Sequence, residues 1–182
     1  MLEIIEEIKT ICVENNFTLS VAESCTGGYL SHLITTIPGS SLFYKGSVVA
    51  YWVEFKEKIL HVSKDTISLH TVVSPQVAIE MAKGVSRLFG STIGLSTTGI
   101  AGPTGELFKR PVGTVCIGLH SPWSTFSKIL KLEGERFDII KKASFEALKI
   151  LLRVLHGRKA SNKYTEQTGK GGEGGVFGDG NK

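Results

Sequence analysis

The feature that most constrains this chain is the alternation of β-rich runs with amphipathic helical segments. Strands are predicted at 17–22, 46–51, 92–98, 112–120 and 125–133, and helices at 2–15, 26–37, 54–60, 75–89 and 136–155. Such alternation predicts an α/β fold, with helices packed on a mainly parallel sheet. The turn at Ser121-Pro122 predicts a hairpin between the last two strands, which places one antiparallel strand in a mixed sheet.

Length and composition favour one globular domain. The chain has 182 residues, of which 41% are hydrophobic and 21% charged, enough for a buried core. We expect this domain to span residues 1–156, because the composition changes at Gly157. Seven of the fourteen residues 169–182 are glycine, so 157–182 is predicted to be a flexible tail.

Charge and cysteine content exclude several classes of function. A net charge of +4 with no basic stripe does not indicate a nucleic-acid partner. No apolar run reaches the roughly 18 residues of a membrane span, and the N-terminus is acidic where a signal peptide would be basic. The three cysteines (Cys12, Cys25 and Cys116) form no CxxC pair. We therefore expect a cytoplasmic protein without a metal site.

The segment "AESCTGG" places reactive side chains where a predicted strand meets a helix. Backbone N–H groups at such a turn favour an anion or a developing oxyanion. Gly27 and Gly28 allow a substrate to approach the backbone closely, and Ser24 has the position that a nucleophile needs. The alternative interpretation is that Ser24 or Thr26 only caps the helix, a common role for these residues.

A serine nucleophile requires a base. The five histidines show no spacing that indicates a catalytic arrangement; they are His32, His61, His70, His120 and His156. Lys56 follows a strand beside Trp52 and Phe55, whose burial of the amine would lower its pKa. Lys58 is a second candidate, and a solvated helix lysine is the alternative interpretation for either.

A glycine- and proline-rich loop follows the third predicted strand. That strand ends at Thr98-Gly99, and the loop contains Gly102, Pro103 and Gly105. Loops at the carboxyl ends of strands bind ligands in open α/β sheets. The loop matches neither the P-loop pattern nor GxGxxG, so the sequence does not indicate either nucleotide-binding motif.

Taken together, these motifs resemble the CinA C-terminal domain family, the nicotinamide-nucleotide amidases. The matching strings are "AESCTGG", "GSVVAY", "VSPQVAIEMAKG", "TTGIAGP", "PVGTV" and "GER", spread over residues 17 to about 155. The resemblance implies a three-layer α/β/α sandwich. It also implies hydrolysis of the carboxamide of nicotinamide mononucleotide to nicotinate mononucleotide and ammonia, with no cofactor.

The resemblance also implies site residues. The family nucleophile falls on Ser24, its base on Lys56 and its motif threonine on Thr98, with Gly99 and Gly102 in the same substrate-binding loop. N–H groups near Gly27 and Gly28 are the expected oxyanion donors. Arg110 and Arg136 are the basic residues expected to pair with the substrate phosphate.

The chain departs from the family pattern at two places. Trp52-Val53 replaces a polar pair, and Glu106-Leu107 replaces Gly-Thr. These changes leave a second hypothesis open, a catalytically weak or inactive module that binds pyridine nucleotides. Apolar residues expected at the surface, which are Trp52, Phe55 and Phe108, predict a homodimer.

Overall fold

A mixed five-stranded sheet lies at the centre of the computed structural model, which describes residues 2–105 and 110–168. In the order β2-β1-β3-β4-β5, its strands are β1 (Leu19–Glu23), β2 (Tyr44–Val49), β3 (Ile93–Gly99), β4 (Thr114–Ser121) and β5 (Ser124–Lys131). β1 pairs in parallel with β2 and β3, whereas β4 is antiparallel to β3 and β5. Four of these strands thus share one direction, which confirms the predicted mixed, mainly parallel sheet.

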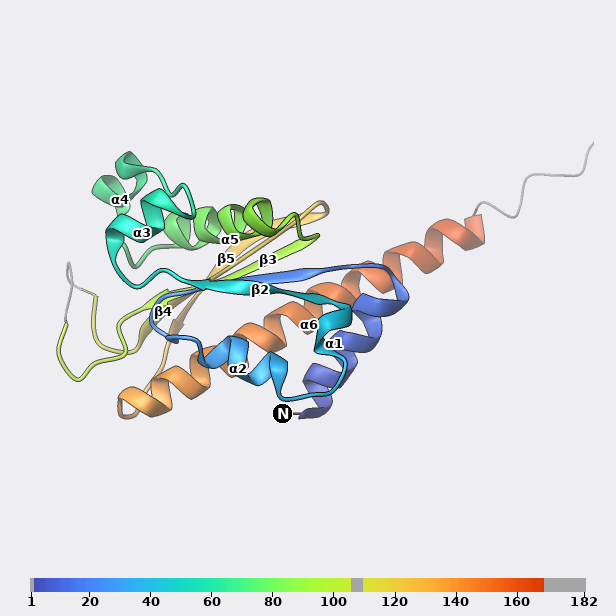
Figure 1. The fold of residues 1–182 in the computed structure, drawn as a ribbon, viewed down its shortest axis with the longest axis horizontal. Coiled ribbons are helices and arrows are strands. Elements are labelled where there is room, and N and C mark those ends of the chain that lie inside the picture. Colours follow the sequence, from blue (N-terminus) through green and yellow to red (C-terminus); the bar gives the residue numbers. More distant parts are fainter. Residues whose placement is uncertain (1, 106–109, 169–182) are drawn as a thin grey trace, which may run out of the picture.

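Helices cover both faces of the sheet. They are α1 (Leu2–Glu14), α2 (Tyr29–Thr35), the short 3₁₀ helix η1 (Ser40–Leu42), α3 (Val53–Lys58), α4 (Lys64–His70), α5 (Pro75–Phe89) and α6 (Arg136–Thr168). Figure 1 shows α3, α4 and α5 on one face and α1, α2 and α6 on the other. The architecture is the expected three-layer α/β/α sandwich.

The largest differences from the prediction concern α4 and α6. α4 was not predicted, because its seven residues bury no side chain fully and so show no clear apolar periodicity. α6 continues to Thr168, past the predicted end at residue 155. Residues 169–182 of the predicted tail lie outside the described part of the chain, and the division at residue 156 stays a prediction.

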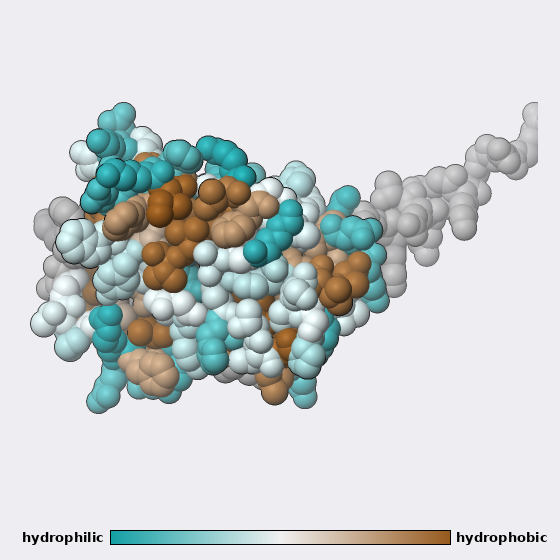
Figure 2. Space-filling model, in the orientation of Figure 1, coloured by the Kyte–Doolittle hydropathy of each residue, from teal (hydrophilic) through white to brown (hydrophobic). Residues whose placement is uncertain are grey.

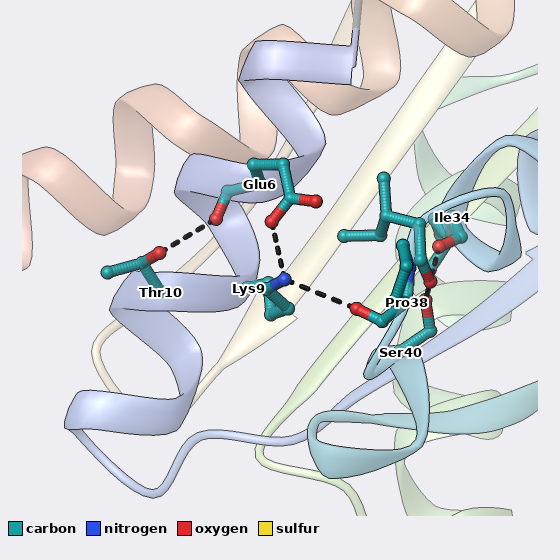
Figure 3. Close-up of polar contacts among 7 residues, drawn as sticks. Glu6, Lys9, Thr10, Ile34, Pro38 and Ser40 are labelled. Atoms are coloured by element: carbon teal, nitrogen blue, oxygen red, sulfur yellow. Dashed lines mark hydrogen bonds and ion pairs between the residues drawn. The ribbon is translucent and has the colours of Figure 1, made fainter.

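A hydrogen bond joins α1 to the chain segment that follows α2. Nζ of Lys9 donates a hydrogen bond to the carbonyl of Pro38 at 3.2 Å and also pairs with Glu6 (Figure 3). The buried hydroxyl of Ser40 lies between the carbonyls of Ile34 (2.7 Å) and Ile37 (2.8 Å). The bond to Ile34 satisfies a carbonyl group in the last turn of α2, which a helix leaves without an internal partner, and the other bonds hold the segment that follows.

α5 packs closely on the sheet through two glycines. It begins at the Ser74 cap, whose hydroxyl accepts a hydrogen bond from the N–H of Val77 at 3.3 Å. A Cβ added to Gly94 on β3 would lie 2.0 Å from the carbonyl oxygen of Ala82, and one added to Gly118 on β4 would lie 2.2 Å from that of Ala78. The absence of side chains at both positions therefore sets the distance between helix and sheet.

We predict that Gly94→Ala destabilises the domain by about 3 kcal/mol or more, because the added methyl must displace the backbone of α5. The control is Gly157→Ala in α6, where the added Cβ meets no atom within 4 Å beyond its chain neighbours and the nearby backbone of its own helix and helix propensity favours alanine. Denaturant unfolding of both variants measures the difference. Equal stability of the two variants would contradict the close contact.

Candidate active site

Three segments that are distant in the sequence meet at one end of the sheet. Ser24 directly follows β1, residues 50–52 follow β2, and Thr98 and Gly99 end β3. The chain leaves β1 for β2 on one side and later returns to β3 on the other side. Open α/β sheets bind ligands where the strand order reverses in this way, beyond the carboxyl ends of the strands.

The buried carboxylate of Glu23 holds the turn after β1. Its Oε2 accepts hydrogen bonds from the N–H groups of Gly28 (2.9 Å) and Leu30 (3.1 Å). Its Oε1 accepts from the N–H of Ser31 (2.8 Å) and from the hydroxyl of the same residue. Hydrogen bonds to a carboxylate are stronger than neutral ones, so Glu23 fixes the path of the turn that carries Ser24.

The capping interpretation of Ser24 and Thr26 is wrong. Oγ1 of Thr26 lies 2.6 Å from Oγ1 of Thr97, and both side chains are buried. Oγ of Ser24 accepts a hydrogen bond from Lys56 instead. Glu23 has the capping role at α2, which leaves the serine hydroxyl for the site.

The expected oxyanion donors are also corrected. The N–H of Gly27 donates to the carbonyl of Ser24 at 3.2 Å, and that of Gly28 donates to Glu23, so neither is available to a substrate oxygen. Their positive φ angles, 60° and 99°, show that both glycines shape the turn. Within the described part of the chain, the N–H of Cys25 donates to no other residue.

Lys56 lies on α3 with its amine beside the serine. The residue is 2% exposed, and Nζ donates to Oγ of Ser24 at 2.9 Å. Nζ also contacts the carbonyl oxygens of Ala50 (2.6 Å) and Tyr51 (3.1 Å). β2 ends at Val49, two residues before the predicted end, so these carbonyls lie beyond the strand and can face the lysine.

Burial controls the protonation of both neighbours of Ser24. Burial lowers the pKa of Lys56 from 10.5 to about 8, and Cys25 acts in the opposite direction. Burial raises the pKa of the Cys25 thiol to about 12, so this cysteine is a neutral thiol near pH 7 and a poor nucleophile. The lysine can lose its proton close to neutral pH, whereas the cysteine cannot.

Ser24 and Lys56 line a pocket of about 180 Å³. Its walls are formed by Ser24, Cys25, Tyr51, Val53, Lys56, Val72, Val73, Thr98, Gly99, Ala101 and Arg136. Four of these eleven residues are valine or alanine, and most of the others carry polar side chains. A pocket in which apolar side chains and convergent polar groups surround a residue with a shifted pKa is a candidate binding site for a small molecule.

Arg136 lies where this pocket meets two others, of about 160 and 480 Å³. Its Nη1 donates to the carbonyl of Gly102 at 2.6 Å, and its Nη2 donates to the phenol oxygen of Tyr51 at 3.0 Å. Both acceptors are neutral, and the guanidinium forms no ion pair with a described carboxylate. It therefore remains able to bind an anion.

The predicted loop residues have different positions. Thr98 and Gly99 line the pocket, but Oγ1 of Thr98 donates to the carbonyl of Val72 at 2.8 Å and so shapes the wall. Gly102 lies in the adjoining 160 Å³ pocket. Arg110 lines none of the three pockets that contain Arg136, and its expected contact with a phosphate stays a prediction.

The other candidate bases are not at the pocket. Lys58 is exposed and forms an ion pair with Glu54 at 2.5 Å. None of the five histidines lines the 180 Å³ pocket; they are His32, His61, His70, His120 and His156.

Sequence reasoning missed several residues of the pocket. Tyr51 contacts both Lys56 and Arg136, yet its position in the sequence shows no spacing that marks it as a site residue. Val72 and Val73 come from the loop before α5, where nothing in the sequence marks them as pocket residues. The altered residues 106–107, and Phe108, lie outside the described residues.

The described residues contain neither a metal-binding cluster nor a membrane-spanning helix. No group of three or more His, Cys, Asp or Glu side chains in residues 2–105 and 110–168 could hold a metal ion. Among the helices of those same residues, none is long and apolar enough to cross a membrane.

The fold and the pocket define an α/β/α protein with a buried serine–lysine pair. The family model of the CinA C-terminal domain matches residues 2–155. The chain belongs to this family.

Relatives and solved structures agree with that assignment. The chain is 45% identical over 151 residues to a CinA-like protein of Fervidobacterium nodosum and 43% identical over 150 residues to one of Dictyoglomus thermophilum. These matches cover 83% and 82% of this chain but 37% and 36% of the relatives, so the chain spans little more than a third of their length.

Two crystal structures have the same fold. A competence damage-inducible protein A of Klebsiella pneumoniae matches with a TM-score of 0.82 and 30% identity, over 85% of this chain and 96% of that one. A competence/damage inducible protein of Agrobacterium tumefaciens matches with a TM-score of 0.81 and 29% identity, over 85% and 94%.

We predict that the stability of the domain relative to a Lys56→Met variant rises between pH 8 and pH 10.5. The folded pKa of about 8 lies below the ordinary value of 10.5, so in this range the unfolded chain binds more protons, and raising the pH favours folding. The full change is about 3 kcal/mol. Urea unfolding at pH 7, 9 and 10.5 measures it, and a pH-independent difference would contradict the lowered pKa.

Proposed function

We propose that this chain hydrolyses the carboxamide of nicotinamide mononucleotide, giving nicotinate mononucleotide and ammonia. The observation that carries this proposal is the 2.9 Å contact between the buried Nζ of Lys56 and Oγ of Ser24. A serine becomes nucleophilic when an adjacent base accepts its proton. Family membership supports the proposal, and the names of the relatives do not specify the reaction.

The surroundings of Lys56 suit the neutral amine. A neutral amine has two N–H donors and one lone pair, whereas an ammonium group has three donors. The carbonyls of Ala50 and Tyr51 can accept the two N–H groups. The lone pair is then directed at Ser24, whose hydroxyl becomes the donor in their contact.

The reaction follows in two stages. Oγ of Ser24 attacks the amide carbon while its proton passes to Nζ of Lys56. The resulting ammonium group then protonates the departing nitrogen, which leaves as ammonia from an acyl-serine. In the second stage, water attacks the acyl-serine ester while the neutral amine of Lys56 accepts a proton from it. The ammonium group of Lys56 then returns this proton to Oγ of Ser24, and the carboxylate product is released. Each stage uses the same pair, so the proposal needs no metal ion.

The N–H of Cys25 is the proposed donor to the oxyanion. It directly follows the nucleophile, as in serine hydrolases that use a strand-to-helix turn. Cys25 lines the pocket. Removal of one oxyanion donor costs roughly 3 kcal/mol of transition-state stabilisation in such enzymes.

The pocket is consistent with a planar amide that bears an anionic group. The apolar wall of Val53, Val72, Val73 and Ala101 can contact an aromatic ring whose carboxamide points at Ser24. The adjoining pockets leave room for the remaining part of a nucleotide. Arg136 at their junction is the proposed phosphate ligand.

We predict that Ser24→Ala and Lys56→Arg each reduce ammonia release from nicotinamide mononucleotide by about 1,000-fold or more. Arginine keeps the positive charge but cannot act as a base, because it does not lose its proton. Lys58→Arg is the matched control and is expected to keep full activity. In the unmodified protein, kcat/KM is expected to rise with pH and to level off above about 8, following the pKa of Lys56.

Wild-type turnover that survives both site substitutions would refute the Ser/Lys assignment. Nucleotide binding by calorimetry, with no turnover from pH 6 to 10, would instead support the inactive binding module. The replacement of a polar pair by Trp52-Val53 motivates this second possibility, since Val53 lines the pocket.

We predict that Arg136→Met raises KM for nicotinamide mononucleotide by about 10- to 100-fold, the effect of losing a charged hydrogen bond. Hydrolysis of the phosphate-free nicotinamide riboside is expected to change little. Steady-state kinetics with both amides separate the roles: an equal loss on both would indicate that Arg136 supports the pocket and not the phosphate.

A further inference from the structure

The backbone N–H of Gly99, at the end of β3, points away from β4. In an antiparallel pair of strands, hydrogen-bonded and non-hydrogen-bonded residue pairs alternate. Ile100 donates its N–H to the carbonyl of Thr114 at 2.9 Å, so the preceding pair, Gly99 and Val115, is a non-hydrogen-bonded one. The N–H of Gly99 is therefore directed to the other side of β3, where β1 lies.

The chain on that side is the turn that carries Ser24. The carbonyl of Thr97, two residues before Gly99, accepts a hydrogen bond from the N–H of Ser24 at 3.0 Å. Residues two apart in a strand direct their backbone groups to the same neighbour, so Gly99 faces the same segment as Thr97. Because β1 ends at Glu23, this segment is the turn and not the strand.

The turn offers the N–H of Gly99 no acceptor. In a parallel ladder that continued past β1, this N–H would donate to the carbonyl of Ser24. That carbonyl accepts instead from the N–H of Gly27 at 3.2 Å. Within residues 2–105 and 110–168, the N–H of Gly99 donates to no other residue. A backbone N–H that lies at the wall of a pocket without an acceptor in the protein can bind a ligand.

Two such N–H groups lie beside the serine. Gly99 and Cys25 both line the 180 Å³ pocket together with Ser24. Serine hydrolases with a strand-to-helix turn hold the oxyanion between two N–H groups: that of the residue after the nucleophile and one from a separate segment. Cys25 corresponds to the first of these groups, and Gly99, which comes from β3, has the position of the second.

The position of Gly99 is fixed by close packing. A Cβ added to this residue would lie 2.7 Å from the carbonyl oxygen of Thr114 and 2.8 Å from Cγ2 of Val115. Only glycine fits between β3 and β4 at this point, so the end of β3 lies against its neighbour without a side chain between them. A donor held rigidly before the reaction needs no reorganisation when charge develops.

The surroundings of the two N–H groups are partly apolar. Val53, Val72, Val73 and Ala101 line the same pocket. Figure 2 shows hydrophobic surface gathered over the end of β2 and α3, where Tyr51 and Val53 are exposed and also line the pocket. Hydrogen bonds to a developing charge are stronger where water is limited, so these donors lie where they are most effective.

We propose that the N–H of Gly99 is the second donor of the oxyanion hole and acts together with the N–H of Cys25. This inference rests on the proposed function, to which it adds a catalytic residue. The amide oxygen becomes negative when Oγ of Ser24 bonds to the amide carbon, and two donors then stabilise it. They also orient the carboxamide, because its oxygen must reach both N–H groups.

A crystal structure of the full chain with pyridine-3-boronic acid tests the geometry. Oγ of Ser24 bonds to boron while its proton passes to Nζ of Lys56, which gives a tetrahedral boronate with one negative charge. One boron-bound oxygen then occupies the place of the oxyanion. We expect this oxygen to lie about 2.7 to 3.1 Å from the backbone nitrogens of both Gly99 and Cys25. Ser24→Ala is the control and is expected to form no adduct.

Replacement of Gly99 by glycolic acid tests the contribution to rate. This change turns the amide into an ester, so it removes the N–H and adds no side chain. We expect kcat for nicotinamide mononucleotide to fall about 100- to 1,000-fold, with little change in KM. The matched control is the same replacement at the exposed Gly39, whose N–H also donates to no described residue; its kcat is expected to be unchanged.

The outcomes separate this inference from the proposed function. An adduct oxygen that contacts only Cys25, or that points to solvent, overturns the second donor even if the nucleotide is hydrolysed. Absence of an adduct at millimolar probe overturns it too, as does a folded Gly99 ester with full kcat. An adduct held by both N–H groups in a chain that does not hydrolyse the nucleotide supports the oxyanion hole and refutes the substrate. Circular dichroism establishes folding, and if the ester does not fold, the boronate structure decides.

Discussion

The burial of the Lys56 amine against Ser24 is the interaction on which the rest of the site depends. Removing an ammonium group from water is costly, and in this chain that cost appears as a pKa of about 8. Nζ keeps three oxygen partners, which is why the side chain can remain buried at all. The desolvation that destabilises the folded protein when Lys56 is protonated also makes the neutral amine available as a base.

The geometry of this pair depends on two features of the backbone. Glu23 binds the N–H groups at the start of α2 and so fixes the turn that presents Ser24. On the other side, β2 ends early enough for the carbonyls of Ala50 and Tyr51 to face Lys56. Neither feature takes part in a proposed chemical step, yet each determines where a reacting atom lies. Positioning of this kind is where active sites gain much of their rate.

The fold was largely predictable from the sequence, because hydrophobic periodicity records which side of each element is buried. The same information is weak for α4, which buries no side chain fully, and at strand ends, where one or two residues decide the direction of a carbonyl. The resemblance identified Ser24 and Lys56, and the structure brings them together. It did not reveal that Gly27 and Gly28 use their N–H groups within the turn, because hydrogen-bond partners are a property of the folded chain.

The departure from the family pattern at Trp52-Val53 affects both the site and the surface. Val53 extends the apolar wall of the pocket, while Trp52 points outward with 70% of its surface exposed. The exposed tryptophan side chain makes no hydrogen bond to Lys56, whose Nζ partners are the Ser24 hydroxyl and the carbonyls of Ala50 and Tyr51. The replacement of a polar pair is therefore compatible with the proposed chemistry. Its clearest physical consequence is exposed apolar surface beside the pocket mouth.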